Sequence, residues 1–192
     1  MEAVWFSFGN QLARWVQFVR DHDQKAGNEH KTIVFVQISS LEEALVAINN
    51  WKVDVVVAQG KPYVVPCTSI TSSGSVGIES GGHGPEAAPP LLTLLPSILS
   101  VTPQNGPPIL AAGGLSNGAH VASLLTLGAS GVVLGTRFLL SPESLYTDAQ
   151  RQALISAGST LSVRTMAFDH ARGTLGWPRG IDGRGIRNSE TL

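Results

Sequence analysis

The chain has almost no cysteine and few charged residues, and each shortage excludes a class of protein. The single cysteine, Cys67, rules out an internal disulfide and a cysteine-rich metal site. Charged residues make up 14% of the 192 residues and the net charge is −1, so no basic surface is expected to attract nucleic acid or an anionic membrane. The longest apolar stretch, 91–101, is interrupted by Pro96 and is too short to cross a bilayer.

A secretion signal is also missing from the sequence. The first residues read MEAVWFSFGNQLARW and lack the basic start and long apolar core of a signal peptide. Together with the single cysteine, this predicts a soluble protein in a reducing, intracellular compartment, the cytoplasm. Apolar residues, by contrast, make up 43% of the chain, and glycine occupies 21 positions. This composition indicates a folded α/β protein with a buried sheet.

Short apolar or β-branched runs alternate with amphipathic stretches along the chain. We expect strands at 3–8, 32–37, 53–58, 108–112 and 131–134. N-cap residues precede the expected helices: Asn10, Ser40, and Ser116 or Asn117, with Ser141–Pro142 opening a last helix that ends near Gly158. This alternation is typical of βαβ units, which build either an open doubly wound sheet or a (β/α)8 barrel. Periodicity alone does not choose between the two.

Glycine stands where two consecutive expected strands end. The first turn contains the pair Gly113 and Gly114, and the second contains Gly135 followed by Thr136. Either turn alone is best explained as a tight connection to a helix. Together they indicate a bound phosphate, because glycine lets an anion approach the backbone N–H groups at a helix start. In a barrel, this rim of strand ends is the ligand-binding face.

Four segments, taken in order, resemble a known family. They are VDVVVAQG (53–60), ESGGHG (79–84), PILAAGGLSNGAHVASLLTLGASGVVLGTRFLLSPES (108–144) and RTMAFDHARGTLGWP (164–178). The chain is similar in these segments to the nitronate monooxygenases, formerly called 2-nitropropane dioxygenases. The resemblance implies a TIM-type (β/α)8 barrel that binds FMN, uses no metal, and oxidises nitronates, and in some members nitroalkanes, with dioxygen.

The resemblance also implies roles for particular residues. His83 would be the catalytic base that removes the proton next to a nitro group, which suits an imidazole because it titrates near neutral pH. Gln59 would contact the flavin, and Gly81 would approach it through its backbone. The FMN phosphate would be held by Gly113, Gly114, Gly135 and Thr136, with Val133 and Leu134 on the strand just before this loop. Many members have glutamine at the position of Val133, so its contact would come from the backbone.

His83 is expected on a loop between Gly82 and Gly84.

Other conspicuous residues are interpreted as structural. Asp21 and Asp23 flank a histidine, but they lie on a polar helix face, so a solvated surface is expected there rather than a metal site. The remaining histidines are expected at the surface, and the tryptophans are expected to pack rather than to stack on a flavin: His22, His30, His120 and His170; Trp5, Trp15, Trp51 and Trp177.

The chain departs from the family pattern in two places. The resemblance implies that it starts at the family's fourth strand, so we expect one domain over 1–192 that forms an incomplete barrel of about the last five βα units. Such a barrel exposes strand edges, which favours association between copies. Second, Lys61–Gly77 separates VVAQG from IESGGHG, which the family joins directly. An inserted loop whose two ends lie close together costs little additional entropy, so the site can form if the insert bulges outward. A retained intron is one hypothesis for its origin.

The sequence leaves three functions open. The first is FMN-dependent oxidation of a small nitronate or nitroalkane by dioxygen, with no nucleic acid or membrane partner. The second is a related flavin barrel, such as an enoyl-thioester reductase that uses a nicotinamide cofactor. The third is a truncated, catalytically inactive fragment or paralogue. Consumption of dioxygen with a nitronate distinguishes the first from the second, which oxidises NADH with an enoyl thioester.

Overall fold

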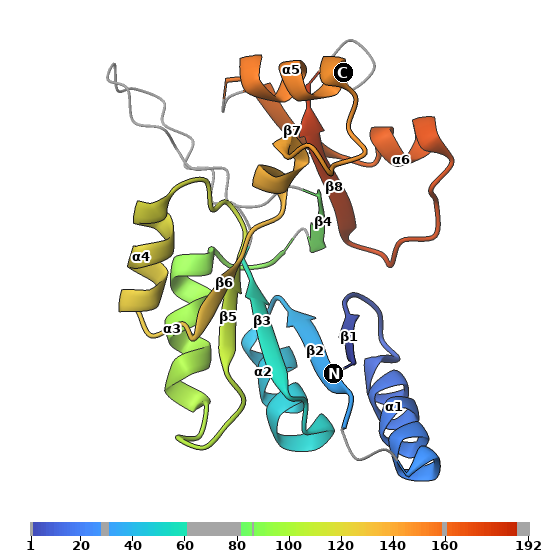
Figure 1. The fold of residues 1–192 in the computed structure, drawn as a ribbon, viewed down its shortest axis with the longest axis vertical. Coiled ribbons are helices and arrows are strands. Elements are labelled where there is room, and N and C mark those ends of the chain that lie inside the picture. The colour runs from blue at the N-terminus through green and yellow to red at the C-terminus, as the bar shows by residue number, and fades with distance from the viewer. Residues whose placement is uncertain (1, 28–30, 61–81, 86, 159–160, 188–192) are drawn as a thin grey trace.

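The computed structural model describes residues 2–27, 31–60, 82–85, 87–158 and 161–187 (Figure 1). Within them the strands form two sheets. A parallel sheet has the order β1-β2-β3-β5-β6: β1 (Ala3–Phe6), β2 (Ile33–Ile38), β3 (Val55–Gln59), β5 (Ile109–Ala112) and β6 (Gly131–Val133). An antiparallel sheet has the order β4-β8-β7: β4 (Gly82–Pro85), β8 (Ile181–Ile186) and β7 (Ser162–Thr165). All five strands expected from the sequence are confirmed.

Helices alternate with the strands of the parallel sheet. They are α1 (Leu12–Ala26), α2 (Leu41–Val46) with the π-helical turn η1 (Ala47–Trp51), α3 (Leu91–Val101) and α4 (Gly118–Thr126). The strands lie in space in the same order as in the chain. Because parallel crossovers are right-handed, this order places every connecting helix on the same face of the sheet. A doubly wound sheet would carry helices on both faces, so the structure favours the barrel alternative.

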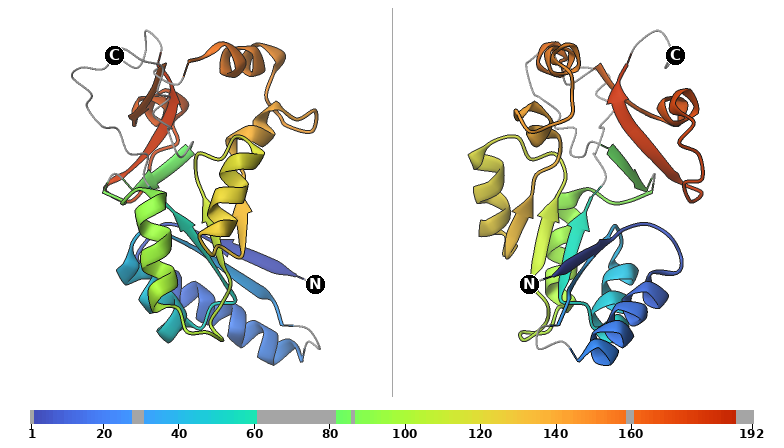
Figure 2. Two further views of the ribbon diagram at one scale, coloured as in Figure 1. Left: turned by 90° about the vertical axis from the view of Figure 1, so that its left-hand side faces the viewer. Right: turned by 45° about the vertical axis from the view of Figure 1, so that its right-hand side comes forward.

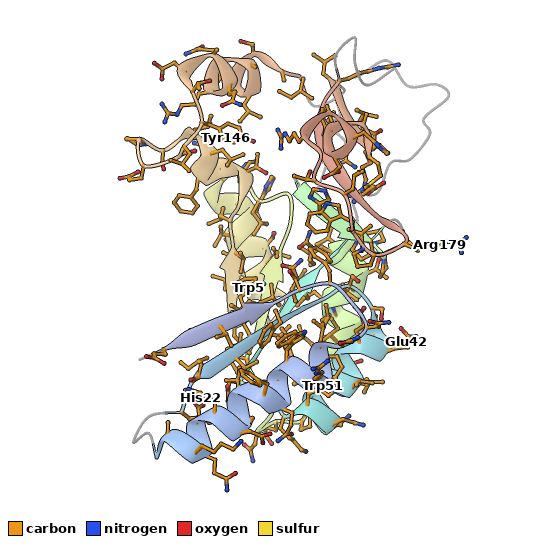
Figure 3. All side chains as sticks on the ribbon, turned by 90° about the vertical axis from the view of Figure 1, so that its right-hand side faces the viewer. Trp5, His22, Glu42, Trp51, Tyr146 and Arg179 are labelled. Carbon is orange, nitrogen blue, oxygen red and sulfur yellow. The ribbon has the colours of Figure 1, made fainter. Side chains whose placement is uncertain are left out.

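The hydrophobic core lies between the parallel sheet and its helices. Alternate residues of β2, Val34, Val36 and Ile38, are buried, and they pack with residues of all four helices. The opposite face of the sheet is buried at Val57 of β3 and exposed toward β1. There Trp5 stacks on Phe35 with ring centroids 5.5 Å apart, and Trp5 keeps 44% of its surface exposed. Figure 3 shows Trp5 on the side of β1 that faces away from α1. The barrel is not closed, and β1 and β6 are its edges.

The antiparallel sheet stands beyond the carboxyl ends of the parallel strands (Figure 2). The 3-10 helix η2 (Thr136–Leu140), α5 (Asp148–Ser156) and α6 (Ala167–Arg172) belong to the same end of the molecule. Arg164 of β7 joins the three strands. Its guanidinium forms an ion pair with Asp182 and donates hydrogen bonds to the carbonyl oxygens of Gly84, at 2.7 Å, and Asp182, at 2.9 Å. The sequence did not predict this sheet.

Two predicted helix starts are wrong. Ser141–Pro142 does not open a helix, because the segment turns back on itself through a hydrogen bond from the Ser144 N–H to the Ser141 carbonyl. Helix α5 begins instead after Thr147, which forms a capping box with Gln150. Asn10 does not cap α1: Gln11 holds that place and its side chain makes no cap hydrogen bond.

The helix caps expected at Ser40 and Asn117 are confirmed. Ser40 accepts a hydrogen bond from the Glu43 N–H, and Asn117 accepts one from the His120 N–H. Gly27 ends α1 in the left-handed region at φ 60°. The carboxylate of Glu43 bonds to Ser39 rather than to Ser40, so the capping box at this helix is only half formed.

The prediction of a solvated surface at Asp23 is also wrong. Its carboxylate is buried and accepts hydrogen bonds from the Thr32 N–H at 2.8 Å and the Thr32 hydroxyl at 2.7 Å. These bonds lower the pKa of Asp23 and tie α1 to β2. No helix in the described part of the chain has the length and apolar character needed to span a membrane. The Lys61–Gly77 segment, with Cys67, and His30 lie outside the described residues.

Candidate active site

The carboxyl ends of three parallel strands form one continuous edge. Gln59 at the end of β3 pairs in register with Ala112 at the end of β5, and Ala112 pairs with Val133 at the end of β6. The glycine turns follow directly after Ala112 and after Leu134. The structure therefore places Gln59, both glycine turns and the end of β6 side by side, as the barrel interpretation predicts.

The first glycine turn requires glycine for backbone reasons. Gly113 and Gly114 have φ values of 110° and 71°, a region that other residues enter only with strain. The chain then enters α4, whose N-cap Asn117 satisfies the His120 N–H. The N–H groups of Gly118 and Ala119, in the first turn of this helix, have no intrahelical acceptor and suit an anion.

The second glycine turn has no such backbone requirement. Gly135 lies at φ −108° and ψ −78°, outside the left-handed region. A Cβ added there would meet nothing within 4 Å. Neither a positive φ nor a contact with another residue requires glycine at this position. The residues of this edge fit a phosphate-bearing cofactor.

His83 lies on β4, at the border between the two sheets. The Gln59 side-chain amide donates to the His83 carbonyl oxygen at 3.4 Å, which brings together two residues predicted to serve one site. The expectation that His83 lies on a loop is wrong. His83 lies opposite Gly183 in the antiparallel pair of β4 and β8. Arg164 donates a hydrogen bond to the carbonyl of the neighbouring Gly84, so the backbone of His83 is fixed on both counts.

The imidazole of His83 contacts a buried carboxylate. Its Nε2 lies 3.0 Å from both carboxylate oxygens of Asp169 on α6, and Asp169 is 2% exposed. The Thr174 hydroxyl donates to Asp169 Oδ1 at 2.9 Å, and the Trp177 indole N–H donates to the same oxygen at 3.0 Å. Burial acts to raise the pKa of Asp169, but hydrogen bonds from His83, Thr174 and Trp177 outweigh it, so the pKa lies below its ordinary value.

Two aromatic rings support this histidine. Trp177 stacks on His83 with ring centroids 3.7 Å apart and planes 14° from parallel. Phe8, in the turn after β1, meets Trp177 edge-on at 5.8 Å and holds a left-handed backbone with φ 62°. Strained backbone of this kind persists where surrounding contacts fix it, and it is common near functional sites. Trp177 is a packing residue as predicted, but the residue it packs on is His83.

Sequence reasoning missed Asp169, Thr174 and Trp177 as site residues. All three occur within RTMAFDHARGTLGWP, one of the segments that carried the resemblance, so a signal for them was present. Gly81 lies outside the described residues. Among the residues that the structure describes, no hydrogen bond joins the His83 side chain to either glycine turn, and no group of side chains could hold a metal ion.

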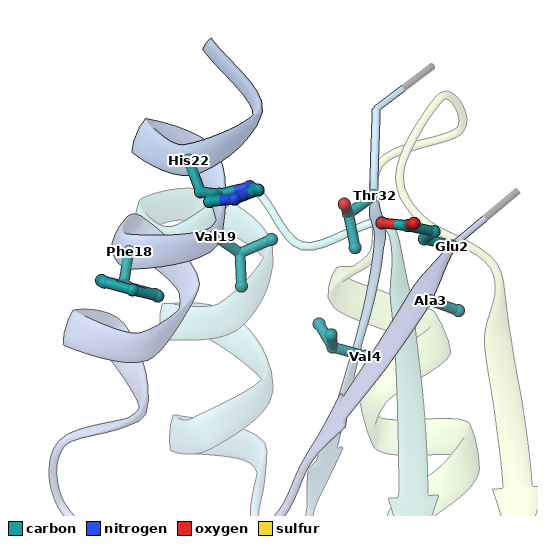
Figure 4. Close-up of a pocket in the computed structure, with 7 residues that line it drawn as sticks. All are labelled: Glu2, Ala3, Val4, Phe18, Val19, His22 and Thr32. Atoms are coloured by element: carbon teal, nitrogen blue, oxygen red, sulfur yellow. The ribbon is translucent and has the colours of Figure 1, made fainter. Parts of the chain in front are cut away.

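A separate pocket lies between α1 and the beginning of β1, as Figure 4 shows. Val4, Phe18 and His22 are among its lining residues. It opens beside the first residues of the edge strand, whereas the candidate site is at the carboxyl ends of the strands. The pocket is therefore distinct from the site, and His22 keeps the exposed position predicted for it.

Comparison with known proteins identifies the family of this chain. Residues 75–176 match the family profile described as "Nitronate monooxygenase". The chain is 35% identical over 161 residues to nitronate monooxygenase npaC of Metarhizium robertsii, an alignment that covers 82% of this chain and 40% of that protein. The chain thus spans well under half the length of that relative.

Solved structures show the same fold and the same partial coverage. The nitroalkane oxidase from Streptomyces ansochromogenes superposes with a TM-score of 0.68 at 25% identity, over 99% of this chain and 46% of that one. FabK from Thermotoga maritima superposes with a TM-score of 0.69 at 23% identity, over 98% and 47%. These neighbours are TIM-barrel enzymes, so the predicted incomplete (β/α)8 barrel is confirmed.

Proposed function

The chain belongs to the nitronate monooxygenase family, and from that membership we propose that its site oxidises a nitronate or nitroalkane with dioxygen. The observation that carries the proposal is the pair of His83 and the buried Asp169, which Gln59 joins to the glycine-lined edge of the barrel. A histidine paired with a carboxylate is suited to take a proton from a carbon acid at neutral pH.

We propose FMN as the cofactor, because the family binds flavin and the glycine edge fits a phosphate. Gly113, Gly114, Gly135 and Thr136 would hold the phosphate, with Val133 and Leu134 beside it and Gln59 and Gly81 toward the ring system. Bound FMN would supply the electron transfer from substrate to dioxygen. The open space over Gly135 supports this assignment, since a side chain there would occupy the place of the phosphate.

His83 would act on the carbon next to the nitro group. A neutral nitroalkane must lose a proton from that carbon before it can be oxidised as a nitronate, and the imidazole would accept that proton. A preformed nitronate is already deprotonated, so it does not need the base. The two substrate forms therefore separate the role of His83 from the roles of the residues that hold the cofactor.

The other expectations belong to the same proposal. We propose that 1–192 forms one barrel domain with 61–77 as an inserted loop, acting in the cytoplasm on small molecules rather than on nucleic acid or membranes. The open edges at β1 and β6 would be covered by further βα units or by a second copy of the chain. The likeness to FabK shows the fold alone and adds no argument for an enoyl-thioester reductase.

Oxygen consumption tests the proposal directly. The purified chain, supplied with FMN, should consume dioxygen with a small nitronate and with its parent nitroalkane, and should not oxidise NADH with an enoyl thioester. His83→Asn should lose about 10²–10⁴-fold in rate on the nitroalkane, the usual contribution of a general base, and much less on the nitronate. Asp148→Asn, at a surface ion pair, is the matched control and should change neither rate. NADH oxidation without nitronate turnover would overturn the proposal.

A further inference from the structure

We propose that Asp169 is a positioning residue that holds His83 as its Nε2–H tautomer, so that Nδ1 is the nitrogen that takes the substrate proton. The identity of the substrate rests on the proposed function above. The tautomer is a property of this chain alone, and it can be measured without cofactor or substrate.

The partners of Asp169 fix the direction of its hydrogen bond with His83. Oδ1 accepts from the Thr174 hydroxyl and the Trp177 indole N–H, and both carboxylate oxygens face His83 Nε2 at 3.0 Å. An ionised carboxylate has no proton to donate. The Nε2 atom must therefore carry the hydrogen in this pair, in the neutral ring as well as in the imidazolium.

The other ring nitrogen is left to act on the substrate. Among the residues that the structure describes, none forms a hydrogen bond with His83 Nδ1. In the neutral Nε2–H tautomer this atom holds a lone pair. When the C–H bond next to the nitro group breaks, its electron pair forms the C=N bond of the nitronate and the negative charge moves to the nitro oxygens. The proton goes to Nδ1, and Asp169 stabilises the imidazolium that results.

Glycine at position 183 provides the room for this arrangement. Gly183 pairs directly opposite His83 on β8, and a Cβ there would lie 3.3 Å from His83 Nε2 and 3.7 Å from Asp169 Oδ2. Its φ is not in the positive range that favours glycine, so glycine is explained by space. The side chain of His83 passes over this glycine to reach Asp169. Trp177 covers one face of the same imidazole, which fixes the plane of the ring.

Nitrogen NMR of the imidazole rings tests the tautomer in the unloaded chain. Five histidines are present, and His83→Gln identifies the signals of His83 by their loss. At a pH where the ring is neutral, wild type should show a protonated, pyrrole-like Nε2 and an unprotonated, pyridine-like Nδ1. Asp169→Asn should give mixed tautomers, because an amide can donate or accept. Asp148→Asn should match wild type. A protonated Nδ1 in wild type, or an unchanged tautomer in Asp169→Asn, would overturn the proposal.

A second variant avoids dependence on Asp169→Asn, which removes a buried charge and can fail to fold. Gly183→Ala keeps every hydrogen-bonding group but crowds Nε2 and Oδ2. We expect it to shift the Nε2 signal toward that of a weaker hydrogen bond and to slow nitroalkane turnover. If the Nε2 signal and the turnover both stay at wild-type values in a folded Gly183→Ala, the geometry does not position His83, and the proposal is wrong.

Turnover rates on the two substrates distinguish a positioning role of Asp169 from a merely structural role. They also show whether the proposed oxidation itself fails. Asp169→Asn should lower kcat on a neutral nitroalkane by at least about ten-fold, and by up to the 10²–10⁴-fold contribution of a general base. Turnover of the preformed nitronate should fall by less than about three-fold, because His83 has no proton to remove there. An equal loss on both substrates would contradict the positioning role. If wild type turns over neither substrate but shows the Nε2–H tautomer, the proposed function fails and the assignment of the tautomer stands.

Discussion

Trp177 lies almost flat against His83, with ring centroids 3.7 Å apart, and its indole N–H bonds to the same carboxylate that holds the histidine. One side chain thus fixes the face of the imidazole and supports its partner Asp169. This arrangement links the segment after α6 to β4, two parts of the chain that lie far apart in sequence.

Replacing Trp177 should therefore affect stability and the site together. Trp177→Phe keeps a ring against His83 but removes the N–H bond to Asp169, and should lower the free energy of unfolding by about 1 kcal/mol. Trp177→Ala removes both contacts and should cost about 2–3 kcal/mol. Urea unfolding measures both values. Trp15→Ala, on an exposed face of α1, is the control and should cost less than Trp177→Ala.

The two glycine turns should respond differently to a side chain. Gly114→Leu places a residue with a Cβ at φ 71°, so the free energy of unfolding should fall by about 1–2 kcal/mol. Gly135→Leu enters open space at a negative φ and should leave stability within about 0.5 kcal/mol of wild type. Thermal and urea unfolding without cofactor compare the two. Equal destabilisation would show that Gly135 is glycine for reasons internal to the fold.

Arg164 should be the main attachment of β4. Arg164→Met leaves the Asp182 carboxylate without its ion pair and the Gly84 carbonyl without its donor, so unfolding should become easier by about 2–3 kcal/mol. Hydrogen exchange at the amides of β4 and β8 should accelerate with it. The comparison variant is Asp148→Asn, whose carboxylate is almost fully exposed in its ion pair with Arg151, and it should cost less than about 1 kcal/mol.

Stability should fall in acid, in part because of Asp54. Burial acts to raise its pKa, but hydrogen bonds from Arg20, the Val34 N–H and Lys31 lower it below the ordinary value of 3.8. A carboxyl whose pKa is lowered by folding stabilises the fold fully above its unfolded pKa, and that stability is lost as pH falls through the folded pKa. Asp54→Asn should therefore flatten the decline in urea stability below about pH 4. A decline as steep as that of wild type would contradict the assignment.

The sequence could predict the parallel sheet because its strands are continuous apolar runs and its helices have regular apolar spacing. Runs such as Val55–Gln59 and the caps at Ser40 and Asn117 are local signals. The antiparallel sheet has no such signal: β8 reads IDGRGI, with two glycines and two charged residues, and pairs only because Arg164 and β4 lie beside it.

The candidate site was predictable only in part for the same reason. His83 and the glycine turns follow from motif and position at strand ends. Asp169 is 86 residues from His83, and no spacing rule connects them. The buried hydrogen bonds of Asp169 exist only once α6 packs on β8. Helix α5 was misplaced because Ser141–Pro142 has the composition of a helix start, while the Thr147 capping box forms six residues later.

We propose that the glycine edge of this chain holds FMN beside His83, and a visible absorbance spectrum of the chain measures this binding. The purified 192-residue chain is mixed with FMN and desalted. We expect wild type to keep the flavin absorbance and Gly135→Leu to lose it while unfolding at the same urea concentration. A colourless wild type, or equal flavin in an equally stable Gly135→Leu, would contradict the claim.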